Sequence, residues 1–404
     1  SGHRRPVLPG LAASEVGRLV TQVAAEQPDP EIVAMVQEAT GGNPFFVRQL
    51  TELLASQGRL HRTAARDRGV PGIPPGIREV VDRRLRQLSD PCAELLSAAA
   101  VLGQEFDLEL VEPLVDLSRD QQLQLLTEAS GARLVDESPG ATRRYRFVHA
   151  LVREVCYERL PVPQRARLHR LAGEAMEERH RDNLEGRLAE LAHHFLQSAV
   201  VDGTTGKAID YADRAGRRAL ALLAYEEAAD HFMRALQLLE GSAPTGVARR
   251  CEVLLALGAA QMATSDVTAA RETYGQAAVL AKGIGARELL AWAALGLGVD
   301  PIGFVDDFEV RVLEEALELL SEDDSGLRAR VLARLAKALR FSPLVERRRA
   351  LSEQAVAMAR RIGDPSTLAA VLHEQHFAMW GVANPAERLT IATEVIEVAE
   401  RYGD

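Results

Sequence analysis

Two short segments come closest to known chemical motifs. Residues 203–208, Gly-Thr-Thr-Gly-Lys-Ala, resemble a phosphate-binding loop. That loop needs a glycine, four residues and then Gly-Lys-Ser/Thr, so that backbone N–H groups wrap the phosphates and a hydroxyl holds Mg²⁺. Val201 stands where the first glycine should be, and Ala208 stands where the hydroxyl should be. The segment therefore predicts a turn between two helices and not a nucleotide site.

The second segment is the pair His193-His194, which lies in a helical pattern. Adjacent side chains on a helix point about 100° apart, so the two rings are not placed to share one metal ion. No carboxylate or cysteine stands at metal-ligand spacing from them. We expect no metal site here, and no hydrolase or transferase constellation stands out elsewhere. The chain is therefore predicted to have no enzyme activity of its own.

Gly42-Asn43-Pro44 is a more specific pattern. Proline lacks an N–H and suits the first turn of a helix, so Asn43 is predicted to cap a helix that Pro44 begins. A capped helix start is one explanation of the pattern. A binding role is the alternative.

His149 stands where one periodicity gives way to another. Tyr145 and Phe147 alternate with arginines, which is typical of a half-buried strand, and apolar residues from Val148 to Cys156 follow at helical spacing. A single histidine at such a junction is either a capping or packing residue or a ligand contact.

Composition favours packed helices. The 404 residues predict two or three domains. Aromatic residues make up only 4% and apolar residues 47%, which suits Leu/Ala/Val cores. The net charge of −10 argues against nucleic-acid binding by the whole chain. The three dispersed cysteines are typical of reduced, buried thiols in a cytoplasmic protein, and no apolar run approaches the ~20 residues that span a bilayer.

The first half of the chain divides at Gly/Pro-rich segments. Residues 1–57 predict a small helical unit whose first helix is capped by Ser14, and residues 58–76 predict a linker. Residues 77–160 predict a winged-helix domain, and residues 161–204 predict connecting helices that include 163–180. The winged-helix domain is expected to contain helices at 77–88, 90–102, 107–116 and 119–130, and strands at 134–136 and 145–147.

Residues 205–404 show a repeat of roughly 40 residues. The pattern Ala228-x3-Phe232-x2-Ala235 recurs as Ala270-x3-Tyr274-x2-Ala277, and Leu257-Gly258 recurs as Leu295-Gly296. Glycines at 285, 363 and 403 follow apolar helical patterns, as at helix C-caps. About five helix pairs fit, and such pairs must stack because none buries its apolar face alone. We therefore predict a mainly α protein whose second half is a right-handed tetratricopeptide-like α-solenoid.

Three features occur in a telling order: Gly41-Gly42-Asn43-Pro44-Phe45-Phe46-Val47, a winged-helix pattern ending in Phe147-Val148-His149-Ala150-Leu151-Val152, and the solenoid. This order resembles the regulatory half of STAND-class signal-transduction ATPases. Within that class it is similar to the LuxR-type, maltose-activator-like regulators and to SARP-type regulators with an ATPase core. The chain begins without Met, and its last helix pair has no obvious polar cap, so we expect it to be part of a longer protein.

The resemblance implies roles for four residues. A Gly-x-Pro motif in the helical lid of that family packs against adenine, which nominates Gly42, Asn43 and Pro44. A histidine after the wing contacts the β-phosphate of ADP, which nominates His149, although Val and Ala flank it here instead of Met and Asp. The P-loop, the Mg²⁺-binding strand and the arginine sensor would lie upstream. We therefore expect no cofactor in this fragment alone, and ATP or ADP with Mg²⁺ in the full-length protein.

The resemblance also assigns sensing to the solenoid. Trp292, Phe377 and Trp380 on its first helices, and Phe304 in the loop 301–307, are candidates for the surface that binds a protein partner or a small-molecule inducer; filling of gaps between repeats is the alternative. DNA would be contacted only through domains outside this fragment, no membrane contact is expected, and activation would involve an oligomer. Two further function classes stay open: a helical-repeat adaptor without nucleotide control, and the sensor module of a cyclase- or kinase-linked protein.

Overall fold

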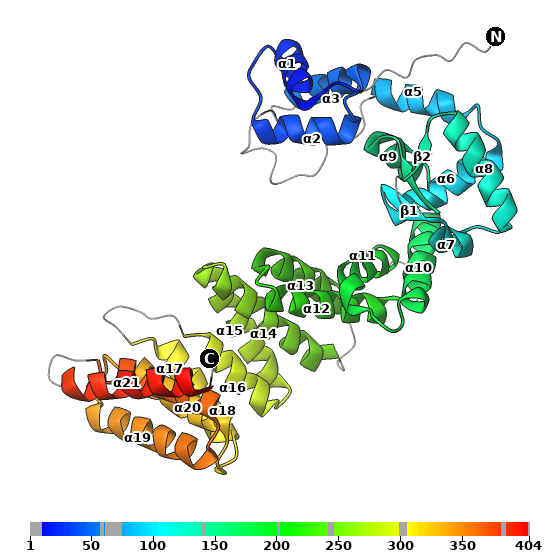
Figure 1. Cartoon of the computed structure of the whole chain (residues 1–404). Helices are drawn as coiled ribbons and strands as arrows, with labels where there is room; N and C mark the ends of the chain where they lie inside the picture. Colours follow the sequence, from blue (N-terminus) through cyan, green and yellow to red (C-terminus); the bar gives the residue numbers. More distant parts are fainter. Residues whose placement is uncertain are drawn as a thin grey trace, which may run out of the picture. The chain divides into compact units, whose positions relative to one another are not determined.

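Helices dominate both compact units of the chain, Ser1–Ala208 and Ile209–Asp404 (Figure 1). The structure is a computed structural model, and it describes residues 10–56, 60, 75–138, 143–199, 203–240, 246–298, 305–380 and 385–402. The strands within these ranges form one small three-stranded sheet in the first unit. The prediction of a mainly α protein is confirmed.

The first unit begins with three short helices, α1 (Ala13–Ala24), α2 (Pro30–Thr40) and α3 (Pro44–Ser56). Their apolar faces form one core. The prediction that Ser14 caps α1 is wrong, because the helix begins at Ala13 and its N-cap residue is Ala12. The Glu15 carboxylate instead accepts a hydrogen bond from the Ala12 N–H at 2.9 Å and so pairs a backbone donor at the helix start.

A second core follows. Its elements are α5 (Pro75–Leu85), α6 (Asp90–Leu102), β1 (Glu105–Asp107), α7 (Leu108–Val111), the 3₁₀ turn η1 (Glu112–Leu114), α8 (Arg119–Gly131), β2 (Val135–Glu137) and β3 (Arg144–Phe147). The sheet order is β1-β3-β2, with both pairings antiparallel. The helix predicted at 107–116 is wrong at its start, because Asp107 ends a strand that the sequence pattern did not reveal. Phe106 pairs with Tyr145 across the sheet and packs 5.5 Å from the buried ring of Phe147, so tertiary pairing decides this segment.

The segment around His149 then changes direction. Phe147 is buried while Arg144 and Arg146 are exposed, which confirms the strand alternation. Helix α9 (Ala150–Glu158) begins two residues later than the apolar pattern suggested, and α10 (Val162–Arg179), the turn η2 (Glu185–Arg187) and α11 (Leu188–Ser198) complete the packing.

Ten helices in five consecutive pairs follow, within the described residues from 203 onward. Their bounds are α12 (Thr205–Ala221), α13 (Tyr225–Leu239), α14 (Val247–Ala263), α15 (Val267–Gly283), α16 (Arg287–Gly296), α17 (Asp307–Leu319), α18 (Gly326–Ala338), α19 (Val345–Ile362), α20 (Pro365–Ala378) and α21 (Pro385–Tyr402).

The glycines of the repeat lie at close helix contacts and after helix C-termini, as the pattern predicted. Tyr274 packs so closely on α14 that a Cβ added at Gly258 would lie 2.8 Å from its ring, and Gly296 faces the same ring. Gly285, two residues after α15, and Gly363, the residue after α19, have φ of +67° and +74°. Gly403 lies outside the described residues.

All three cysteines are buried and free of disulfides, as predicted. Burial raises the pKa of Cys92 and Cys156 to about 12 and that of Cys251 to about 11. None of the described helices is both long and apolar enough to cross a bilayer.

Candidate functional site

The turn between α2 and α3 is built by two successive glycines in the left-handed region. Gly41 has φ of +57° and Gly42 has φ of +72°. The turn is closed from outside by the Leu11 N–H, which donates to the Gly42 carbonyl at 2.8 Å. A Cβ at Gly42 would collide with the backbone of Leu11. Both the dihedral angles and the close approach therefore require glycine at position 42.

Asn43 and Pro44 start α3 as predicted. The Asn43 Oδ1 accepts a hydrogen bond from the Phe45 N–H at 3.1 Å, and the Asn43 carbonyl accepts one from the Val47 N–H at 2.9 Å. Pro44 is exposed, and so is Phe45 beside it. The turn therefore presents an apolar surface at a capped helix N-terminus.

The structure brings this turn against His149. The His149 ring lies edge-on to the buried ring of Phe46, with centroids 5.3 Å apart and an interplanar angle of 88°. A Cβ added at Gly41 would lie 2.7 Å from His149 Nδ1. His149 is the N-cap residue of α9, but its side chain makes no capping hydrogen bond. The His149 side chain therefore does not cap α9, whereas its packing against Phe46 is observed.

The surroundings of His149 favour a neutral ring. Burial lowers its pKa, the positive charge of Arg84 lowers it further, and Asp136 acts in the opposite direction. Nδ1 is buried and has no hydrogen-bond partner in the described part of the chain. A buried N–H without an acceptor is costlier than a buried lone pair, so the tautomer with its proton on Nε2 is favoured. That tautomer makes Nε2–H the group of this ring that can donate to a ligand.

Two kinds of group meet near this turn. Pro44 and Phe45 are exposed apolar side chains, and the neutral His149 ring carries one hydrogen-bond donor. Within the described ranges, no group of three His, Cys, Asp or Glu side chains could hold a metal ion.

The segment at 203–208 serves packing. Lys207 Nζ pairs with the Glu177 carboxylate at 2.5 Å and lies 5.0 Å from the centroid of the Phe195 ring. These contacts agree with the predicted turn followed by a helix.

His194 of the histidine pair belongs to a buried hydrogen-bonded cluster that the sequence analysis did not predict. His194 shares a hydrogen bond with His169, with 3.0 Å between their Nδ1 atoms, and His169 Nε2 lies 2.9 Å from the Tyr157 hydroxyl. His169 and His194 are both buried. A signal was available for His169, because it stands three residues after Ala166 and three before Ala172 on the buried stripe of α10.

The aromatic candidates of the second unit separate into two places. Phe377 and Trp380 stack, with centroids 5.7 Å apart and an interplanar angle of 22°. The Lys337 ammonium lies 5.0 Å from the Phe377 centroid, and the Arg388 guanidinium lies 4.6 Å from that of Trp380. Trp292 stands on α16, and no contact described in this structure joins it to that pair. Trp292 and Trp380 are exposed, so neither simply fills a gap between repeats. Phe304 lies outside the described residues.

No protein-family model matches the chain, and no curated protein matches it. Among solved structures, it is similar to a signal transduction ATPase with numerous domains (STAND) that has a tetratricopeptide repeat sensor, PH0952 from Pyrococcus horikoshii, at 15% identity and a TM-score of 0.30. That match covers 98% of this chain, which spans 59% of the other protein. It is also similar to aspartyl phosphate phosphatase F from Bacillus subtilis, at 8% identity and a TM-score of 0.39, over 98% of this chain and 87% of that one. At such scores we transfer no function from either protein.

Proposed function

We propose that the chain is the regulatory and sensing part of a nucleotide-gated transcriptional regulator of the STAND class, LuxR-type or SARP-type. In this proposal ADP or ATP binds between an upstream ATPase core, the turn at Gly42-Asn43-Pro44 and His149. The repeats of the second unit bind a partner or an inducer and shift the equilibrium between closed and open states.

One observation carries the proposal. The turn at 41–44 and His149 are far apart in the sequence, and the resemblance to one family nominated both of them. They lie in direct contact through Gly41 and Phe46. A packing role alone requires only that the ring be apolar on one side. It does not require the buried Nδ1 of a histidine, which has no hydrogen-bond partner within the described residues.

The nucleotide role is tested in the protein that includes its upstream core. The change is His149→Ala, and the measurement is the ADP dissociation constant by calorimetry. A hydrogen bond to a charged phosphate contributes about 1.5–3 kcal/mol, so ADP should bind at least about tenfold more weakly. Basal activity should rise as the closed state is lost.

His180→Ala is the matched control, because His180 is the C-cap residue of α10 and no described contact joins it to the turn at 41–44 or to Phe46. Unchanged ADP affinity in His149→Ala would show that His149 has only a packing role. On the present chain, a micromolar or tighter ADP dissociation constant would contradict the assignment of the phosphate cradle to an upstream core.

The exposed aromatic residues favour a second candidate, a helical-repeat adaptor without nucleotide control. Trp380 is exposed and braced by Phe377 and Arg388, as an anchor for a protein partner would be. Partner binding that is indifferent to ADP and to His149→Ala would favour the adaptor.

A further inference from the structure

Four large apolar side chains are exposed near the ends of the last helix pairs. Phe341 is 45% exposed, Leu344 49% and Val345 49%, all at the turn from α18 to α19, and Trp380 is 55% exposed just after α20. We call these four residues the aromatic edge. A contiguous group of exposed apolar side chains marks a candidate interaction site.

The four residues follow the C-terminal ends of α18 and α20, and these two helices run parallel. Arg330 near the start of α18 donates to the Ser366 hydroxyl at the start of α20, at 3.2 Å. One turn further, Arg334 pairs with Glu374 at 3.2 Å, and Lys337 then lies over the ring of Phe377. Helix α18 ends at Ala338 and α20 ends at Ala378, so Phe341 and Trp380 both lie just beyond this end of the pair.

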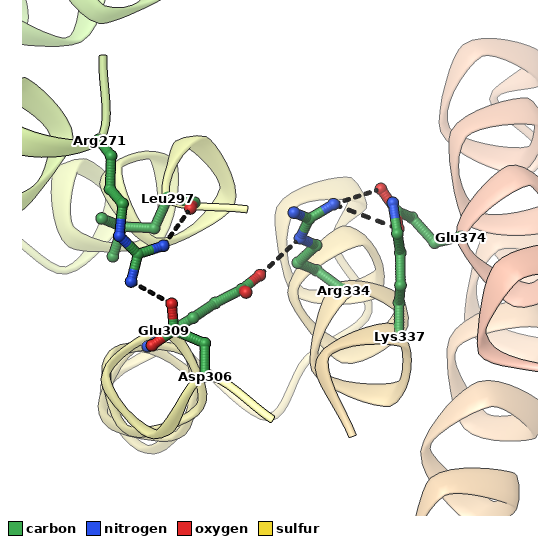
Figure 2. Close-up of polar contacts among 7 residues, drawn as sticks. All are labelled: Arg271, Leu297, Asp306, Glu309, Arg334, Lys337 and Glu374. Carbon is green, nitrogen blue, oxygen red and sulfur yellow. Dashed lines mark hydrogen bonds and ion pairs between the residues drawn. The ribbon is translucent and has the colours of Figure 1, made fainter. Parts of the chain in front are cut away.

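A largely buried chain of ion pairs joins α17, α18 and α20 (Figure 2). The Arg334 guanidinium pairs with Glu309 of α17 at 2.9 Å and with Glu374 of α20, and Lys337 pairs with the same Glu374 at 3.2 Å. The guanidinium occupies the space where a side chain at Gly298 would lie. At the edge itself, Phe377 and Arg388 stack against the Trp380 indole. A partner would therefore meet a preorganised aromatic anchor, which lowers the entropic cost of binding.

The charge around the aromatic edge is opposite to that of the chain. Residues 340–349 contain four arginines and one glutamate, whereas the whole chain has a net charge of −10. In the described structure no carboxylate lies within ion-pair distance of Arg348 or Arg388. Arg347 and Arg349 are partly neutralised, by Glu314 at 2.6 Å and by Glu353 at 3.9 Å. The edge thus combines apolar anchors with a positive rim.

We propose that the aromatic edge binds an acidic, amphipathic segment of a partner protein, with apolar side chains on Phe341 and Trp380 and carboxylates facing Arg348 and Arg388. Apolar contacts would supply most of the affinity, and the charges would set partner choice and association rate. The inference rests on the part of the proposed function that gives partner binding to the repeats, and it names the chemistry of that partner.

The two tryptophans of the chain make a direct test available. In a Trp292→Phe background Trp380 is the sole tryptophan. The probe is a tryptophan-free amphipathic peptide of Glu, Leu and Phe, and the comparison peptide has Lys at every Glu position. The acidic peptide should shift Trp380 emission to the blue in a saturable way, and the lysine peptide should not.

Affinity is then measured by anisotropy of the labelled acidic peptide. Arg348→Glu should weaken binding about tenfold, since it replaces an attraction by a repulsion at the rim. Because Arg348 also donates to the Arg340 carbonyl, Arg349→Glu on the exposed face of α19 is the second variant, with the same expected direction. Arg287→Glu is the matched control, because Arg287 is exposed at the opposite, N-terminal end of a first helix and should leave binding unchanged.

Equal affinity for the acidic and lysine peptides would overturn the inference. So would a blue shift produced by phosphatidylserine vesicles but not by the acidic peptide, which would assign the edge to a membrane surface. Acidic-peptide binding that is unaffected by both arginine variants would place the partner elsewhere on the repeats and leave the proposed function standing. No nucleotide enters these assays, so a failure of nucleotide gating is detected separately, by the ADP measurement.

Discussion

The stability of the first unit should fall steeply below pH 6.5 because of the buried pair His169 and His194. Burial lowers the pKa of His169 from 6.5 to about 2 and that of His194 from 6.5 to about 3. The neighbouring histidines act in the same direction, His194 and His193 on His169 and His193 on His194, and so does Arg153 on both rings. Arg165 acts on His169 in the same direction. Each ring also has a neutral hydrogen-bond role in the Tyr157–His169–His194 chain. The folded unit therefore resists protonation that the unfolded chain accepts.

The magnitude follows from linkage. Below pH 6.5 the unfolded state binds protons that the folded state does not, so the free energy of unfolding decreases as pH falls. At pH 5 each histidine contributes a loss of about 2 kcal/mol, from 1.5 pH units at about 1.36 kcal/mol each, and the pair contributes about 4 kcal/mol. The loss begins near pH 6.5 and continues until the folded pKa values near 3 and 2 are reached. Total stabilities of about 5–15 kcal/mol make this a large effect.

The buried cysteines provide the assay. Cys92 and Cys156 report the first unit and Cys251 reports the second, since all three thiols become reactive only on unfolding. The chain is equilibrated in urea at pH values from 7.5 to 5, pulsed with a fast thiol reagent and analysed by mass spectrometry. The urea midpoint of Cys92 and Cys156 labelling then gives the stability of the first unit at each pH.

The decisive comparison is His194→Asn, which keeps a polar group near the position of Nδ1 but cannot titrate. It should reduce the pH-dependent loss by about 2 kcal/mol between pH 7.5 and 5, whatever its effect on absolute stability. His193→Asn, at the neighbouring exposed position, is the control and should retain most of the wild-type slope. Since the lowered pKa of His149 adds to the slope in the same direction, the variant difference is the test. An unchanged slope in His194→Asn would refute the reasoning.

Two further predictions concern the tight turn at Gly41 and the buried ion pair between Arg334 and Glu309. Gly41→Ala should destabilise the first unit by about 1–2 kcal/mol in the same Cys156 assay, because it places a Cβ at a left-handed residue and against His149. The control is Gly131→Ala, whose added Cβ meets nothing within 4 Å, so this change should be neutral or slightly stabilising. Equal effects of the two changes on stability would contradict this account. Arg334→Met should lower the stability of the second unit by about 3–5 kcal/mol, measured by Cys251 labelling, because it leaves the buried Glu309 uncompensated. Adding Glu309→Met should recover much of that loss, and a double variant no more stable than the single one would argue against an uncompensated charge as the cause.

Much of the local structure was predictable from the sequence because its causes are local. Proline at a first turn, with asparagine before it, predicted the α3 start at Asn43, and the structure confirms the cap. Alternation of Tyr145 and Phe147 with arginines predicted β3. The roughly 40-residue period of small and aromatic residues predicted the five helix pairs, because stacking such pairs requires glycine where Tyr274 enters. The nucleotide and partner roles of the nominated residues stay predictions.

Contacts between distant segments were decided only in three dimensions. Glu105–Asp107 became a strand because β3 was available to pair with it, which no local pattern announces. His169 and His194 face each other because α10 and α11 pack in one register, and Glu309, Arg334 and Glu374 meet from three separate helices. The meeting of Gly41 with His149 is of the same kind. Sequence motifs nominated the two sides of that junction, but only the packing of α2 and α3 against the start of α9 put them in contact, because side-chain burial and hydrogen bonding between remote segments depend on the whole fold.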